Sequence, residues 1–135
     1  MANTGGVMIN FIHKIKSYLF LIFLLIFLIS TSDKAFADCS VSASEAYDGY
    51  RDAKRAYRAS DLDDCHRYAK KAYRHFSYAE DEAISCGCSY AESEAYDGYR
   101  DAKRAYRADD LESCHSYARK AYKHGSYAED EANGC

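Results

Sequence analysis

The chain of 135 residues contains neither proline nor tryptophan. Without proline, no position forces a break inside a helix. The longest apolar run, Tyr18 to Ile29, has 12 residues, whereas a membrane-spanning helix needs about 20. The sequence also lacks a Gly-rich phosphate loop and a Gly-rich turn that would present a nucleophile. These absences argue against a membrane-spanning protein and leave no sequence sign of a catalytic centre.

The N-terminal segment resembles a secretory leader. Lys14 and Lys16 precede the apolar run, and residues 35–37 (Ala-Phe-Ala) have the small-x-small pattern of a cleavage site. We therefore expect a signal peptide over 1–37 and a mature protein over 38–135. The mature protein should be periplasmic or extracellular and should keep no stable membrane anchor after cleavage.

The expected mature protein is acidic. The leader holds Asp33 and three lysines (Lys14, Lys16 and Lys34), so 15 Lys and Arg face 20 Asp and Glu, a formal net charge of −5. This balance argues against a general polyanion binder, although charge can still be segregated locally. We expect a protein or peptide partner and no nucleic acid.

The mature sequence consists of two close copies. Cys39–Cys86 and Cys88–Cys135 are 48 residues long each, offset by 49, and identical at 36 aligned positions; Gly87 alone separates them. A repeat this close indicates one structural unit packed against its twin. We expect repeat 1 over 38–86 and repeat 2 over 88–135, together forming one compact domain.

Small and apolar residues recur with helical spacing. Steps of three and four connect Leu62, Cys65, Ala69, Ala72, Phe76, Ala79, Ala83 and Cys86. We predict an all-α fold of two antiparallel hairpins, with helices over 42–58, 61–84, 90–107 and 110–133. The hairpins could form a side-by-side stack or a square bundle.

Local signals mark the helix ends. Capping-box spacing joins Ser42 to Glu45, Ser60 to Asp63, Ser89 to Glu92 and Asp109 to Glu112. Gly87 suits a left-handed C-cap between the repeats. On the core stripe the copies differ most at Phe76, which aligns with Gly125. We hypothesise that one Phe fills a central space that cannot hold two.

Six cysteines in a short exported chain are typical of disulfides. The first and third cysteine of each repeat lie at the open end of the hairpin, which predicts Cys39–Cys86 and Cys88–Cys135. The middle cysteine lies about 30 Å from that end at 1.5 Å per residue, beyond bridging distance. We favour a Cys65–Cys114 disulfide, with two buried thiols or an intermolecular bridge as alternatives. This bridge forms more easily in a side-by-side stack than across a square bundle.

The turn of each hairpin carries a family resemblance. Small residues at Ala56 and Ala59 precede the turn of repeat 1, Asp61 and Leu62 follow it, and alanines recur along the second helix. This pattern resembles the turn and second helix of a tetratricopeptide repeat. The 49-residue offset and the missing Trp and Pro depart from that family, whose period is 34. The resemblance implies a stacked hairpin and peptide binding.

Two Cys-His pairs are the candidate metal ligands: Cys65 with His66, and Cys114 with His115. Adjacent residues of a helix point about 100° apart, so both side chains of a pair rarely face one ion. We favour structural cysteines beside surface histidines and predict no cofactor.

Two surface features could bind a partner. Tyr78 and Tyr127 lie outside the core stripe and, if exposed, are candidate hot spots. Basic residues interleave with tyrosine mid-hairpin at Lys54, Arg55, Arg58, Lys70, Lys71 and Arg74. Such surfaces can hold nucleic acid or acidic glycans. We favour a solvated face with helix ion pairs Asp52–Arg55 and Asp63–Arg67.

The sequence therefore predicts an exported, non-catalytic, disulfide-stabilised helical repeat protein that acts as a binding or structural module. One alternative is a metal-binding protein that uses the Cys-His pairs. Another is a secreted effector or toxin directed at a host, which would share the same sequence features. The oligomeric state stays open.

Overall fold

The computed structural model describes residues 38–135, and the expected leader over 1–37 lies outside this part. It contains four α-helices: α2 Ser40–Tyr57, α3 Leu62–Cys86, α4 Ser89–Tyr106 and α5 Leu111–Gly134. The predicted all-α fold is confirmed, and every helix end lies within two residues of its prediction. Over residues 38–135, no helix is long and apolar enough to cross a membrane.

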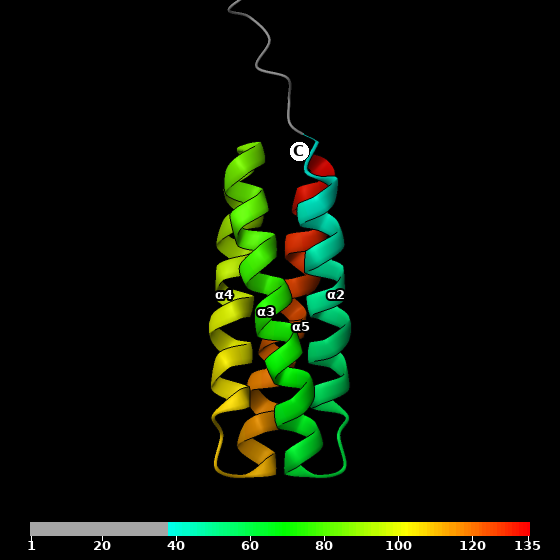
Figure 1. Cartoon of the computed structure of the whole chain (residues 1–135), viewed down its shortest axis with the longest axis vertical. Helices are drawn as coiled ribbons and strands as arrows, with labels where there is room; N and C mark the ends of the chain where they lie inside the picture. Colours follow the sequence, from blue (N-terminus) through cyan, green and yellow to red (C-terminus); the bar gives the residue numbers. More distant parts are fainter. Residues whose placement is uncertain (1–37) are drawn as a thin grey trace, which may run out of the picture. The chain divides into compact units, whose positions relative to one another are not determined.

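The helices form one antiparallel bundle (Figure 1). Each helix packs mainly against two neighbours, in the cyclic order α2, α3, α4, α5 and back to α2. The remaining pairs face each other across the diagonals, and α3 meets α5 more closely than α2 meets α4. The two hairpins therefore close into a square bundle, one of the two arrangements that the sequence allowed.

The core consists mostly of alanine, arranged in layers of equivalent residues from both repeats. One layer holds Ala46, Ala79, Ala95 and Ala128, each at most 1 % exposed. These are two aligned pairs, 46 with 95 and 79 with 128, so the repeats are related by an approximate two-fold axis along the bundle. Because alanine side chains are short, the helices can approach closely.

Phe76 interrupts this regularity at the centre of the bundle. It is fully buried and is the largest fully buried side chain. A Cβ atom at Gly125 would lie 2.7 Å from the Phe76 ring, and one at Gly49 would lie 2.5 Å from it. The space opposite Phe76 is thus already filled by its ring, which supports the hypothesis that the centre holds one Phe.

The second helix of each hairpin begins with an aspartate cap. The Asp61 carboxylate accepts a hydrogen bond from the Asp64 N–H (2.8 Å), and Asp110 accepts one from the Ser113 N–H (2.7 Å). These caps come one residue after the predicted ones, Ser60 and Asp109. The chain in both turns runs one residue further before its backbone becomes helical.

The capping boxes predicted for the first helices are wrong. α2 and α4 begin after Cys39 and Cys88, and neither residue caps its helix through its side chain. Ser42 lies inside α2, where its buried hydroxyl donates to the Ala79 carbonyl of α3 (2.9 Å). Disulfides hold these helix starts in place of caps. The predicted left-handed C-cap at Gly87 is confirmed, with φ 79°.

Candidate functional site

All six cysteines form disulfides, in the pairs favoured from the spacing: Cys39–Cys86, Cys65–Cys114 and Cys88–Cys135. The Cα atoms of Cys65 and Cys114 are 6.5 Å apart. Their bridge joins α3 to α5 across a diagonal of the bundle. The sequence had favoured a side-by-side stack for this bridge. Alanines in the same layer explain the diagonal bridge, because Ala69 and Ala118 leave room for the two helices to approach.

The Cys-His pairs do not assemble a metal site. Cys65 and Cys114 are bonded to each other, so neither offers the thiolate that zinc needs. His66 reaches the Ala108 carbonyl (Nε2 to O 2.8 Å), and His115 reaches the carbonyl of Ala59 (2.9 Å). Each histidine thus bonds the turn of the other repeat. The metal-binding alternative is not favoured, because its ligands are used in holding the two hairpins together.

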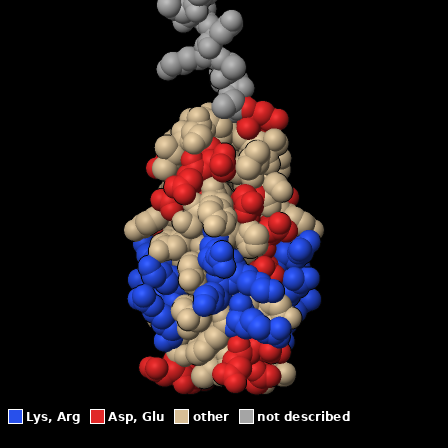
Figure 2. Space-filling model, viewed as in Figure 1, with Lys and Arg blue, Asp and Glu red and all other residues tan. Residues whose placement is uncertain are grey.

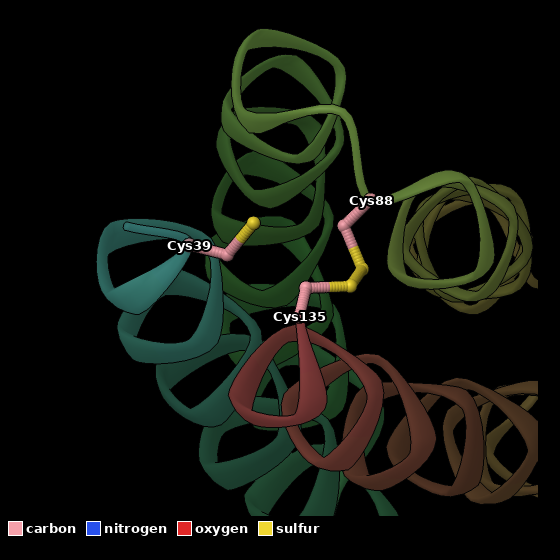
Figure 3. A group of neighbouring side chains, drawn as sticks. All are labelled: Cys39, Cys88 and Cys135. Carbon is pink, nitrogen blue, oxygen red and sulfur yellow. A yellow bond between two sulfur atoms is a disulfide. The ribbon is translucent and has the colours of Figure 1, made fainter. Parts of the chain in front are cut away.

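A second sulfur cluster lies at the open end of the bundle. The Sγ atoms of Cys39, Cys88 and Cys135 lie within 4.8 Å of one another. Figure 3 shows Cys88 joined to Cys135, with the Cys39 side chain directed toward the same region. Cys39 is itself bonded to Cys86. The cluster is therefore two adjacent disulfides, one from each repeat, and it offers no thiolate to an ion.

The other two histidines of residues 38–135 contact carboxylates of a neighbouring helix, which the sequence did not predict. His75 Nδ1 lies 2.7 Å from a Glu45 carboxylate oxygen, and Nε2 of the same ring lies 3.9 Å from the buried Asp52. His124 repeats this arrangement with Glu94 and Asp101 at the same distances. The only sequence signal was the identical spacing in both repeats, since each pair joins two helices of one hairpin. These histidines therefore serve as links between helices.

The acidic triplets at 80–82 and 129–131 lie near the open end. Burial raises the pKa of the Glu80 carboxyl, and the charges of Asp81 and Glu92 raise it further. Burial also raises the pKa of Glu129, followed by the charge of Asp130. No Lys or Arg occurs in the last turn of α3 or α5 to offset these charges. The open end therefore carries uncompensated negative charge.

Tyr78 and Tyr127 are exposed, as the candidate binding surface requires. Their exposed fractions are 51 % and 56 %. They lie on different helices, α3 and α5, which are diagonal neighbours in the bundle. The two tyrosines are therefore equivalent residues of the two repeats, and they do not form one common surface.

The most pronounced surface feature is a belt of positive charge. All 15 Lys and Arg of the described residues lie in four segments, one on or directly after each helix: 51–58, 67–74, 100–107 and 119–123. We call these 15 residues the basic belt. Figure 2 shows it as a band across the visible face, with acidic side chains gathered above and below. The positive charge of an acidic chain is thus gathered at one level of the bundle, and the local segregation of charge is strong.

Most cations of the basic belt have no carboxylate partner. Five arginines pair with an aspartate three residues earlier in the same helix: Arg51, Arg55, Arg67, Arg100 and Arg104. The predicted Asp52–Arg55 pair is among them, but Arg67 pairs with Asp64 instead of the predicted Asp63. Within the described part of the chain, the other ten Lys and Arg form no ion pair. Ion pairs within helices therefore involve one third of the belt cations.

A groove between α4 and α5 opens within the belt. Its lining combines three tyrosines, four cations and two carboxylates: Tyr96, Tyr99, Tyr117, Arg100, Lys103, Arg104, Arg107, Asp109 and Asp110. The Lys103 ammonium donates a hydrogen bond to the Tyr99 hydroxyl (2.7 Å) and lies 5.0 Å from the ring centroid. The groove therefore presents two unpaired cations, Lys103 and Arg107, on an amphipathic wall that also carries carboxylates.

Comparison of the chain with protein-family models, with curated proteins and with solved structures finds no match. The resemblance to tetratricopeptide hairpins therefore stays confined to the turn and the second helix. The closed bundle also differs from the stack that this resemblance implied, since α2 packs against α5 as well as α3.

Proposed function

We propose that the protein is an exported, non-catalytic binding module whose basic belt contacts an anionic partner. The observation that carries this proposal is the gathering of every described Lys and Arg into one belt on an otherwise acidic bundle. Charge concentrated in this way attracts a partner of opposite sign over roughly a Debye length, ~8 Å at physiological salt. The anionic partner replaces the expectation of an unspecified protein or peptide.

The disulfides and the leader-like segment support export. Disulfides persist in oxidising compartments, such as the periplasm and the extracellular space. Three of them hold a bundle of 98 described residues. A frame cross-linked at both ends keeps the belt cations of four helices at one level, so less conformational entropy is lost when a partner binds.

The residues with reactive side chains support a non-catalytic role. Every cysteine is in a disulfide. His66 and His115 bond backbone carbonyls, and His75 and His124 pair with glutamates. Each of these groups thus has a structural partner, whereas nucleophilic catalysis needs a nucleophile beside a positioned base.

The test compares two variants that each carry four substitutions of exposed residues, two in each repeat. The belt variant carries Lys71→Gln, Arg74→Gln, Lys120→Gln and Lys123→Gln, which are equivalent exposed residues in the two repeats and make no ion pair. The end variant carries Asp81→Asn, Glu82→Gln, Asp130→Asn and Glu131→Gln, equally exposed and duplicated. Thermal unfolding followed by circular dichroism verifies that both fold like the wild type.

The measurement is retention of labelled mature protein, with its disulfides intact, on envelope and extracellular material of the source cells. We expect the wild type and the end variant to be retained and the belt variant to be lost. Equal retention of all three proteins would contradict the proposal. Catalytic turnover abolished by one point substitution would contradict the non-catalytic assignment.

A further inference from the structure

The basic belt surrounds the bundle on all sides. Four of its cations come from each of α2, α3 and α4 with their C-caps, and three come from α5. Because these four helices form the four corners of a square, the cations are distributed around the perimeter and no single face holds them all. A flat surface such as a membrane can touch only one side of such a ring. The geometry favours a flexible, elongated partner that follows the perimeter.

Acidic residues confine this partner to the level of the belt. Near the turns, Asp61 and Asp110 cap the helices with their carboxylates, and other aspartates lie beside them. Toward the open end, segments 75–99 and 124–135 contain acidic residues but no Lys or Arg. A polyanion that slid along the bundle axis would meet like charge in either direction. The belt is therefore positively charged and is limited to one level along the bundle axis.

The tyrosines of the belt discriminate between kinds of polyanion. Single-stranded nucleic acid binds proteins largely by stacking its bases on aromatic faces. Here cations already lie over those faces, at 4.8 Å for Arg67 on Tyr68 and 5.1 Å for Lys54 on Tyr50. In repeat 2, Lys120 lies 5.4 Å from the Tyr117 ring. A base would have to displace these cations, which lowers the benefit of stacking.

We infer that the ligand of the basic belt is an acidic polysaccharide, a linear polymer with carboxylate or sulfate groups, that winds around the bundle. This inference rests on the proposed function. The polymer places anionic groups on the ten cations that lack a carboxylate partner, and the groove between α4 and α5 holds one of its acidic units. There Lys103 and Arg107 are the unpaired cations, and they share the groove with the carboxylates of Asp109 and Asp110.

Binding is measured by fluorescence anisotropy of labelled mature protein, with its disulfides intact. The probes are dextran sulfate, polygalacturonate, neutral dextran, single-stranded oligothymidylate and vesicles that contain an anionic phospholipid. The same belt and end variants are used, and salt is varied at each titration. The dextran sulfate is supplied as chains shorter and longer than the perimeter, roughly 60–80 Å for a square of helices about 10 Å wide.

We expect both acidic polysaccharides to bind and neutral dextran not to bind. Long chains should bind more tightly than short ones at equal charge concentration. The belt variant should bind about tenfold or more weakly and with a shallower dependence on salt, because fewer counterions are released. The end variant should bind as tightly as the wild type, or more tightly.

Other outcomes overturn the inference. Oligothymidylate binding more tightly than either polysaccharide would indicate a nucleic acid surface, and preferential vesicle binding would indicate a membrane surface. If no probe binds but cell material retains the protein in a belt-dependent way, the polysaccharide is wrong and the proposed function stands. If retention does not depend on the belt, both are wrong.

Discussion

Repeat 1 and repeat 2 place equivalent residues in equivalent surroundings along most of the bundle, but not at its centre. His66 and His115 exchange hydrogen bonds with the turns of the opposite repeats. At the centre, Phe76 of repeat 1 meets Gly125 of repeat 2. A residue on a two-fold axis would meet its own copy, so a large side chain fits there only once. The comparison shows that a large side chain at this position can be present in only one of the two repeats.

The largest expected effect comes from removing the asymmetric residue. Phe76→Ala leaves a cavity in the centre of the bundle and should lower the free energy of unfolding by about 3–5 kcal/mol. Gly125→Phe should also destabilise, because its ring would overlap that of Phe76. Guanidinium unfolding with the disulfides intact measures both variants.

The swapped variant, Phe76→Gly with Gly125→Phe, is the matched control. It places one Phe in the other repeat and should recover most of the stability lost in Phe76→Ala. If Gly125→Phe alone were clearly more stable than the wild type, the centre would hold two aromatic rings and this account would be wrong.

Removing the Cys39–Cys86 or the Cys88–Cys135 disulfide compares how much each one stabilises its repeat. Cys39 and Cys86, like Cys88 and Cys135, are separated by 47 residues in sequence. Loop-closure entropy therefore predicts equal losses, about 2–4 kcal/mol, when either pair is replaced by alanine. Urea unfolding of the two double variants provides the measurement. A much larger loss in one repeat would show that its staple does more than restrict the unfolded chain.

Two aligned glycines, Gly49 and Gly98, lie at different distances from the Phe76 ring. A Cβ at Gly49 would lie 2.5 Å from the Phe76 ring, whereas one at Gly98 would lie 3.2 Å from it. Gly49→Ala should therefore cost about 1–3 kcal/mol through overpacking. Gly98→Ala should be close to neutral, since alanine favours a helix by up to about 1 kcal/mol over glycine. The melting temperatures of the two variants measure this difference.

The same two substitutions in the swapped variant give the stringent control. Moving Phe to position 125 should reverse the ranking, so that Gly98→Ala becomes the costly change. An unchanged ranking would mean that the backbone at Gly49, and not the position of the Phe ring, sets the cost.

The smallest effect concerns the acidic open end. A folded-state pKa raised above the ordinary 4.5 means that stability is highest below that value and falls as pH rises through the raised one. Glu80→Gln and Glu129→Gln should therefore raise the melting temperature slightly at pH 7. Glu80→Gln should do so more, because Glu92 adds to its repulsion while Ala43 occupies the aligned place near Glu129.

The control for this last prediction is the pH itself. At pH 3.5 the carboxyls are protonated in the folded and the unfolded chain, so both glutamine variants should melt with the wild type. An advantage that persisted at this pH would have to come from packing.

Helices and disulfides were predictable because they depend on local spacing. Alanines in steps of three and four define α3 and α5, and the distance along a helix restricts which cysteines can meet. The basic residues at mid-hairpin were visible in the sequence, but the Glu45–His75 pair and the alignment of those residues into one belt were not predictable in this way. Both depend on the relative height of neighbouring helices, which no single helical pattern contains. The N-cap of α3 was also misplaced by one residue, at Ser60 instead of Asp61, because either residue fits the local pattern.

The Cys65–Cys114 bridge has a consequence for the integrity of the chain. The two bridges at the open end of the bundle enclose 39–86 and 88–135, and they leave the link through Gly87 outside both loops. The diagonal bridge encloses 65–114 and so spans this link. Every peptide bond from Cys39 to Cys135 is therefore enclosed by at least one disulfide. A protease that cuts any one of these bonds, even in an exposed turn, leaves a nicked molecule whose pieces are still covalently joined.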